Sequence, residues 1–211
     1  METVLILDFG AQYSQLIARR VREQNVYCEV KPCSISPDEI RKLAPIGIIL
    51  SGGPQSVYES VSLHVDPALF SLGIPVLGIC YGCQLMAYSL GGTVAAATEA
   101  TAREYGKTLT EFDTQSAIFH GLPASSVTWM SHGDYISQVP DGFTVTAKTA
   151  VCPTAAMACP EKKLYGVQFH PEVQHTVQGS EILRRFLYSV CGASGDWTMA
   201  DYRQTAIRAI R

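Results

Sequence analysis

Short apolar runs alternate with helix-like segments through the first 90 residues of this chain. The apolar runs are Val4–Phe9, Val26–Val30, Gly47–Leu50 and Pro75–Ile79. The segments with helical spacing or helix-start signals between and after them are Gln12–Gln24, Ser36–Leu43, Asp66–Leu72 and Tyr81–Leu90. Nearly continuous apolar runs of this length are typical of parallel strands buried on both faces. The alternation predicts an α/β fold with a doubly wound, mostly parallel central sheet flanked by helices.

The pattern changes between Thr93 and Lys163. Short β-like runs with turn residues between them (KTLTEF, SVTWM, FTVTAKT and AAMAC) predict an antiparallel β section added to the same domain. Glu161–Lys163 is expected to turn a hairpin into Leu164–Phe169, and Gly179–Val190 has the spacing of a last amphipathic helix. The 211 residues, 47% of them hydrophobic, suit one domain or one domain with an extension.

Charge and cysteine content exclude several classes of function. The net charge is −3, and no basic field is present that would hold nucleic acid. The N-terminus lacks a basic region and a cleavage site, and its apolar run is too short to span a membrane, so we expect a cytoplasmic protein. Seven cysteines, an odd number spread through the chain, make a disulfide framework improbable.

Three conspicuous motifs stand at the predicted carboxyl ends of strands, where α/β sheets gather their chemistry. They are Asp8-Phe9-Gly10, Ser51-Gly52-Gly53 and Gly78-Ile79-Cys80. In the last motif, glycines at positions 78 and 82 leave room for a sharp strand-to-helix turn that exposes the Cys80 sulfur. The start of the following helix favours a thiolate, and its free N–H groups can stabilise an oxyanion. Tyr81 would supply one such backbone donor, and the Gly52-Gly53 turn is the best candidate for a second.

A cysteine nucleophile usually needs a base, and the base needs an orienting partner. The segment YGVQFHPEV offers both, because His170 ends an apolar run and Glu172 follows across Pro171. A histidine after a strand is more often structural, but a His-Pro-Glu run beside a separate nucleophile turn is far more specific than either part alone.

Together, GICYGCQ and GVQFHPE resemble the class I (triad) glutamine amidotransferase family, whose fold is flavodoxin-like. The resemblance covers nearly the whole chain. It implies a catalytic triad of Cys80, His170 and Glu172, and an oxyanion hole made by the backbone N–H groups of Gly53 and Tyr81. It also implies a place for Gln84 in the glutamine pocket, and hydrolysis of L-glutamine to glutamate and ammonia through a γ-glutamyl thioester on Cys80.

Four further segments (ILDFGAQYSQLIARRVRE, ILSGGPQSVYE, WMSHGD and SGDWTM) are similar to the GMP-forming subgroup of that family. The similarity implies that Ser131, His132 and Asp134 bind the α-amino and α-carboxylate ends of glutamine. In that subgroup an ATP-pyrophosphatase (synthetase) domain uses the ammonia to aminate xanthosine monophosphate to GMP, and the full-length enzyme is expected to be a homodimer.

The synthetase domain's S-G-G-x-D-S loop is missing from this sequence. We therefore expect residues 1–192 to form the amidotransferase domain and residues 193–211 a linker helix toward an absent synthetase domain. ATP and magnesium would belong to that absent domain, and no cofactor or metal is expected in this one.

Other interpretations remain. Cys80-x-x-Cys83 could be a redox pair, or could join His170 and His175, or Cys28 and Cys33, around zinc. The domain could be an interaction module with an inert triad, or could serve anthranilate, CTP or carbamoyl phosphate synthesis. The family commonly has methionine where this chain has Cys83, so Cys83 is expected to fill core space, with a disulfide to Cys80 under oxidation as a minor hypothesis.

Overall fold

The computed structural model describes residues 1–10, 13–60, 62–97, 103–200, 202 and 207, and its centre is one nine-stranded sheet. The strand order in this sheet is β2-β1-β3-β4-β11-β10-β9-β6-β7, and β5 and β8 form a separate two-stranded sheet. The strands are β1 Thr3–Asp8, β2 Tyr27–Pro32, β3 Gly47–Leu50, β4 Val76–Ile79, β5 Thr93–Ala96, β6 Glu104–Phe112, β7 Ser125–His132, β8 Asp134–Gln138, β9 Thr144–Lys148, β10 Ala156–Cys159 and β11 Leu164–Val167. The α-helices are α1 Ser14–Glu23, α2 Pro37–Leu43, α3 Tyr81–Ser89 and α4 Gly179–Arg185.

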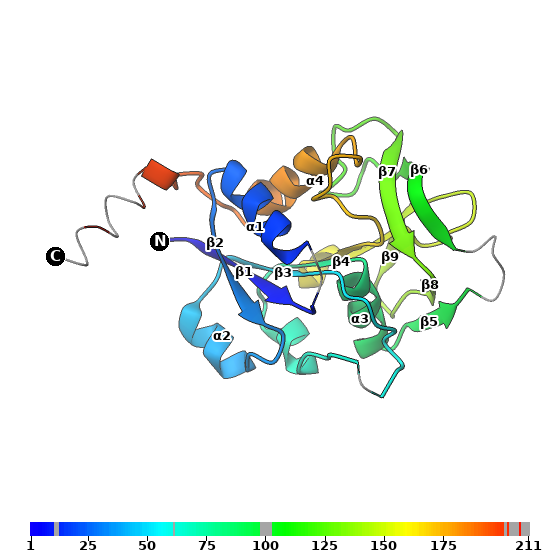
Figure 1. The fold of residues 1–211 in the computed structure, drawn as a ribbon, viewed down its shortest axis with the longest axis horizontal. Helices are drawn as coiled ribbons and strands as arrows, with labels where there is room; N and C mark the ends of the chain where they lie inside the picture. Colours follow the sequence, from blue (N-terminus) through cyan, green and yellow to red (C-terminus); the bar gives the residue numbers. More distant parts are fainter. Residues whose placement is uncertain (11–12, 61, 98–102, 201, 203–206, 208–211) are drawn as a thin grey trace.

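Strands β2, β1, β3, β4 and β11 are parallel, and helices cover both of their faces (Figure 1). Alternate residues of β1 point to opposite faces. Val4 and Ile6 belong to the core under α1 and α4, whereas Leu5 and Leu7 belong to the core under α2 and α3. The prediction of a doubly wound parallel sheet is therefore confirmed.

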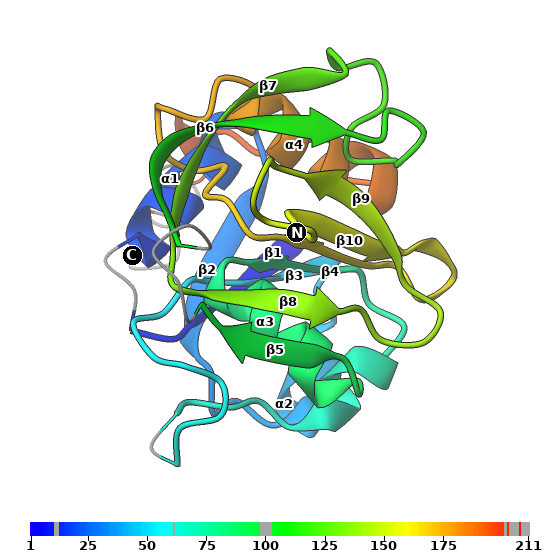
Figure 2. The same cartoon turned by 90° about the vertical axis from the view of Figure 1, so that its right-hand side faces the viewer.

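The antiparallel section continues the same sheet, because β10, β9, β6 and β7 follow β11 in antiparallel order. The hairpin between β10 and β11 turns through a 3-10 turn at Pro160–Lys162 and a left-handed Lys163, as expected from the sequence. Strands β5 and β8 were missed by the sequence pattern; Figure 2 shows them side by side, on the side of the main sheet where α3 lies. Strand β5 (TVAA) has only four residues and β8 (DYISQ) only five, so neither shows a clear alternation of apolar and polar residues.

Several helix boundaries follow the sequence signals. Ser36 caps α2 in a capping box with Glu39, and Pro37 stands at its first position. The predicted start of the first helix at Gln12 lies outside the described residues, and α1 begins at Ser14. The last predicted helix runs as α4 and continues as a π-helical segment, Phe186–Val190.

The segment after α4 returns to the β2 edge of the sheet. The backbone N–H of Trp197 donates to the Asn25 carbonyl oxygen at 3.3 Å, and the rings of Tyr27 and Tyr202 stack with centroids 5.4 Å apart. The linker helix was expected over residues 193–211, of which residues 201, 203–206 and 208–211 lie outside the described part of the chain, so that prediction stays open. No helix among the described residues is long and apolar enough to cross a membrane.

Candidate active site

Cys80 occupies a sharp turn between β4 and α3. Its φ and ψ are 52° and −107°, a conformation that L-residues rarely adopt. The flanking glycines make the turn possible, since a Cβ at Gly78 would lie 2.6 Å from the backbone of Gly82, and one at Gly82 would lie 2.6 Å from Leu50. The Cys80 N–H donates to the Val167 carbonyl oxygen at 2.8 Å, which attaches the turn to β11. The cysteine is thus held in a strained geometry by neighbours on both sides.

His170 and Glu172 follow β11, the strand paired with β4, so the sheet register brings them to Cys80. His170 Nδ1 lies 2.7 Å from Glu172 Oε1, and both side chains are buried. The Thr176 hydroxyl donates to the His170 carbonyl oxygen at 2.6 Å, and Arg20 Nε donates to the Glu172 carbonyl oxygen at 2.9 Å. The backbone of this turn is therefore fixed from two other segments.

The electrostatics of this trio favour a protonated imidazole. Burial lowers the pKa of His170, but hydrogen bonds and charges from Cys80 and Glu172 outweigh it and raise that pKa to about 11. Glu172 Oε2 is buried without a hydrogen-bond partner among the described residues, so the carboxylate's one observed polar partner is His170. A carboxylate beside an imidazole favours the protonated imidazole, so Glu172 raises the pKa of His170.

A pocket of about 340 Å³ opens in front of the Cys80 turn. Seven of the nine residues that the sequence suggested line it, namely Gly53, Cys80, Tyr81, Gln84, Ser131, His132 and Asp134. Gly53 packs so closely that a Cβ there would lie 3.2 Å from the Phe9 carbonyl oxygen and from the Tyr81 ring. Tyr81 stands at the first position of α3, where helix N–H groups have no partner within the helix.

The loop after β3 forms a wall of this pocket that sequence reasoning missed. Gln55, Ser56 and Glu59 line the pocket, and so does Tyr105 from β6. Asp134 holds the loop, because its carboxylate accepts hydrogen bonds from the Ser56 hydroxyl and, at 2.9 Å, from the Tyr58 hydroxyl. The segment ILSGGPQSVYE carries the signal, but the sequence pattern points to Gly53 alone within it.

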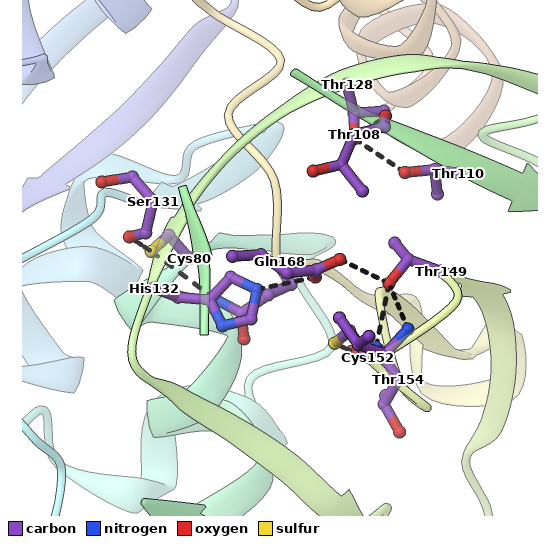
Figure 3. A network of polar contacts seen from close by, with 12 residues as sticks. Cys80, Thr108, Thr110, Thr128, Ser131, His132, Thr149, Cys152, Thr154 and Gln168 are labelled. Atoms are coloured by element: carbon purple, nitrogen blue, oxygen red, sulfur yellow. Dashed lines mark hydrogen bonds and ion pairs between the residues drawn. The ribbon is translucent and has the colours of Figure 1, made fainter. Parts of the chain in front are cut away.

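Ser131, His132 and Asp134 of the WMSHGD segment have different positions relative to the pocket. The Ser131 carbonyl oxygen lies 3.7 Å from Cys80 Sγ. Figure 3 draws this contact as a dashed line. The His132 side chain is only 1% exposed, with Nδ1 2.9 Å from the Asp134 carbonyl oxygen and Nε2 3.2 Å from Glu104 Oε2. The imidazole thus supports the wall from behind, while the Asp134 carboxylate bonds to the loop that forms the opposite wall.

A buried polar network continues behind His132 (Figure 3). The Thr149 hydroxyl donates to Glu104 Oε1 at 2.6 Å, and the Cys152 thiol donates to the Thr154 carbonyl oxygen at 3.4 Å. Burial, with the charge of Glu104, raises the pKa of Cys152 to about 12, so it stays a thiol.

The described part of the chain brings neither of the suggested zinc sets together. Glu104, His132 and Cys152 are the described side chains close enough to share a metal ion. Their polar atoms are already engaged within the protein.

Cys83 lies inside the core rather than beside the pocket. It is fully buried and free, and a Cβ at Gly166 would meet its sulfur at 2.5 Å. Burial holds the pKa of its thiol well above the usual value. The sulfur therefore fills the space that Gly166 leaves open, as a core-filling role requires.

Gln84 and Gln168 form a buried pair of amides beside Cys80. Gln84 Nε2 donates to the Asp134 carbonyl oxygen at 2.9 Å and to Gln168 Oε1 at 3.0 Å. Gln168 Nε2 in turn lies 3.6 Å from Cys80 Sγ. Sequence reasoning included Gln168 within GVQFHPE but gave it no role.

Comparison with known proteins identifies relatives of this chain. Curated relatives include the GMP synthases (glutamine-hydrolyzing) of Clostridium botulinum (strain Alaska E43 / Type E3) and Acetivibrio thermocellus, which are 53% and 55% identical over 210 residues. These alignments cover 100% of this chain and 40% of each relative, so the chain spans about 40% of their length.

Two solved structures extend the comparison. A protein from Thermoplasma acidophilum that is named as a GMP synthase subunit is 31% identical, with a TM-score of 0.81 and 98% of both chains covered. A glutamine amidotransferase from Thermotoga maritima shares the fold, with a TM-score of 0.72, 20% identity, and 91% of this chain and 99% of that chain covered. The model of the family "Glutamine amidotransferase class-I" matches residues 5–190. The chain therefore belongs to the class I glutamine amidotransferase family.

Proposed function

We propose that the chain hydrolyses the side-chain amide of L-glutamine, with Cys80 as the nucleophile. The observation that carries the proposal is a cysteine held at a strand-to-helix turn beside a buried His170–Glu172 pair, with a pocket of about 340 Å³ in front of it. Nucleophile, base and orienting carboxylate in hydrogen-bond reach are the parts that acyl transfer through cysteine requires.

The proposed starting state is a Cys80 thiolate beside a His170 imidazolium. Nδ1–H donates to Glu172 at 2.7 Å, which leaves Nε2–H for the reacting groups. Because the pKa of His170 is raised to about 11, the imidazole is charged at neutral pH and can give up a proton as an acid.

In the first step, the sulfur attacks the amide carbon of glutamine, and the carbonyl oxygen becomes an oxyanion. The backbone N–H groups of Gly53 and Tyr81 are the proposed donors to that oxygen. His170 gives its Nε2 proton to the amide nitrogen, the C–N bond breaks, and ammonia leaves. The product on the enzyme is a γ-glutamyl thioester, and His170 is now neutral.

In the second step, water attacks the thioester carbon and gives one proton to His170 Nε2. The C–S bond breaks, the electron pair returns to the sulfur, and glutamic acid leaves and ionises. This restores the thiolate–imidazolium pair. The step uses side chains, backbone N–H groups and water, so no cofactor in this domain is part of the proposal.

For glutamine binding we propose the pocket wall that contains Asp134, Ser131 and Gln84. The carboxylate of Asp134 suits the α-ammonium group, and the polar groups of Ser131 and Gln84 suit the remaining amide and carboxylate ends. For His132 we propose a supporting role, because both ring nitrogens face protein acceptors behind the wall.

A direct test combines glutamine turnover with covalent labelling. A glutamine-like alkylating analogue should modify Cys80, and mass spectrometry of peptides should locate the adduct there. Cys80→Ala should abolish both the label and glutamate release, and His170→Ala should abolish glutamate release. Cys191→Ala, which removes a half-buried thiol elsewhere, should change neither. Labelling mainly at another cysteine would contradict the proposal.

We further propose that the ammonia serves ATP-dependent amination of xanthosine monophosphate to GMP, with ATP and magnesium bound by a synthetase part. The support is the identity of 50–55% to the GMP synthases of several bacteria. No observation on this chain favours anthranilate, CTP or carbamoyl phosphate synthesis.

This acceptor can be tested by mixing the chain with the synthetase part of the Clostridium botulinum relative, xanthosine monophosphate, ATP and magnesium. Glutamine should then support GMP formation, and Cys80→Ala should abolish that support while ammonium salts still work. If ammonium salts yield GMP and glutamine does not, the proposal that this chain supplies ammonia to a GMP-forming synthetase part is wrong.

A further inference from the structure

Gln168 lies where β11 meets the candidate active site, and its backbone is fixed on two sides. It directly follows Val167, whose carbonyl oxygen accepts from the Cys80 N–H at 2.8 Å. Its own N–H donates to the Ala155 carbonyl oxygen at 2.8 Å. The side chain is completely buried, and its Nε2 lies 3.6 Å from Cys80 Sγ. Gln168 and His170 are two residues apart, as are residues that share one face of an extended strand.

The orientation of the Gln168 amide is fixed by the hydrogen bonds of its neighbours Asp134 and Gln84. The Asp134 carbonyl oxygen can only accept, so the Gln84 atom 2.9 Å from it is the NH₂ group. The same NH₂ group lies 3.0 Å from the Gln168 amide, so the Gln168 atom facing it is the oxygen. The NH₂ group of Gln168 is thereby directed at the Cys80 sulfur (Figure 3).

The polar groups around the Cys80 sulfur are one hydrogen-bond acceptor and two donors. The Ser131 carbonyl oxygen, 3.7 Å away, can pair with the protonated thiol but not with the thiolate. His170 and Gln168 are donors, and of these His170 must give its proton away during the reaction. The Gln168 amide has no titratable proton at neutral pH, so it remains a donor through every step.

We propose that Gln168 is a further catalytic residue, which stabilises the Cys80 thiolate both at rest and when the sulfur leaves the thioester. The proposal rests on the proposed glutaminase function for its catalytic part. In the second step, the C–S bond breaks and its electron pair moves to Sγ, while the water proton goes to His170 Nε2. At that moment the Gln168 N–H donates to the sulfur, on which the negative charge develops, and Gln84 keeps the amide from turning.

The test measures the acidity of the Cys80 thiol in Gln168→Met, which removes the donor at similar size. Iodoacetamide labelling of Cys80 is followed against pH. The titratable groups that interact with the thiol, His170 and Cys83, are unchanged in this variant, and so is Glu172, which bonds to His170. A hydrogen bond to a charged group lost from a buried site predicts a midpoint shifted upward by about 1 to 2 pH units. Exposed Gln115→Leu is the matched control and should leave the profile unchanged.

Glutamine turnover then separates catalysis from binding. We expect kcat for Gln168→Met to fall about 10- to 100-fold, with little change in KM. Gln168→Asn, whose amide is one methylene shorter, should show the same upward shift, and it replaces Gln168→Met if that variant does not fold by circular dichroism.

An unchanged labelling profile in a folded variant would overturn the proposal. Because labelling needs no glutamine turnover, a shifted profile in a chain that fails to hydrolyse glutamine would count against the proposed function alone.

Discussion

At the scale of single residues, the candidate site depends on an unusual backbone conformation at Cys80 and an unusually high pKa at His170. Cys80 keeps a positive φ that costs of order 1 to 3 kcal/mol, and the close packing of Gly78 and Gly82 maintains it. His170 keeps a proton in a buried place because hydrogen bonds and charge interactions with Cys80 and Glu172 raise its pKa. Strain and charge are thus concentrated on the two groups that the proposed reaction uses.

Cys80→Ala should lower the pKa of His170. Burial lowers that pKa, and Cys80 and Glu172 together raise it to about 11, so removing the thiol leaves burial opposed by Glu172 alone. The imidazole, protonated at about pH 8 in the parent chain, should then lose its proton at a lower pH. A nitrogen NMR titration of the His170 ring measures this, with Cys191→Ala as the control. An identical titration in Cys80→Ala would mean that sulfur and imidazole do not interact.

At the scale of elements, the pairing of β4 with β11 carries the site. Gly78 and Gly166 are register partners, and both lie where α3 packs on the sheet. A Cβ at Gly78 would meet the backbone of Gly82 at 2.6 Å, whereas a Cβ at Gly166 would meet the Cys83 side chain. The first clash cannot be relieved by trimming a side chain, and the second can.

Gly166→Ala should lower the free energy of unfolding by about 1 to 3 kcal/mol, and Cys83→Ala should restore part of this loss. The reason is that the new methyl group would occupy the space of the Cys83 sulfur, 2.5 Å away. Urea denaturation of the two single variants and the double variant measures the coupling. Gly78→Ala combined with Cys83→Ala should show no such rescue. Simple additivity for Gly166 and Cys83 would contradict the packing described.

The β6–β7 ribbon supports the substrate wall through Glu104. Glu104→Ala should lower the free energy of unfolding by about 2 to 3 kcal/mol, because it removes the carboxylate that pairs with His132 Nε2 and with the Thr149 hydroxyl. Glu111→Ala on the same strand is the control. It removes only an exposed ion pair to Lys148 at 3.4 Å and should change stability by less than about 1 kcal/mol. Equal effects in a urea titration would show that the buried network is not stabilising.

At the scale of the whole molecule, the pocket is assembled from distant parts of the chain. The loop after β3, the start of α3 and the turn between β7 and β8 meet around it. Asp134 joins two of these parts, since it bonds to Ser56 and Tyr58, 78 and 76 residues earlier. The pocket exists only when all three segments are docked on the sheet.

Asp134→Asn should raise the KM for glutamine about 10- to 100-fold, with a smaller effect on kcat. The amide oxygen can still accept one hydrogen bond from the loop, but the negative charge proposed to meet the α-ammonium group is gone. Steady-state glutaminase assays measure this, and the exposed Asp141→Asn serves as the control. A fall in kcat at constant KM would move Asp134 from substrate binding to another role.

Much of the parallel half and of the candidate site could be predicted from local pattern. Apolar runs indicated the buried strands, Ser36-Pro37 marked a helix start, and two glycines around Cys80 marked a turn. The groups that were missed are polar residues with distant partners in the chain. Glu104 and His132 are 28 residues apart, Ser56 and Asp134 are 78 apart, and Gln168 and Cys80 are 88 apart. No local periodicity encodes such a contact.

Local sequence is enough to predict the strand and helix segments of the parallel half, the sharp turn at Cys80 and the His170–Glu172 pair, because each depends on neighbours within a few residues. The place of β11 between β4 and β10 follows from tertiary packing instead, because the end of β4 at Ile79 and the Lys163 turn before β11 are 84 positions apart in the chain. The pairing of β4 with β11 sets Gln168 beside Cys80, and the pairing of β6 with β7 sets His132 beside Glu104. Such placements follow from the packing of a whole sheet, where the burial of apolar faces selects one strand order, rather than from the preferences of any single segment.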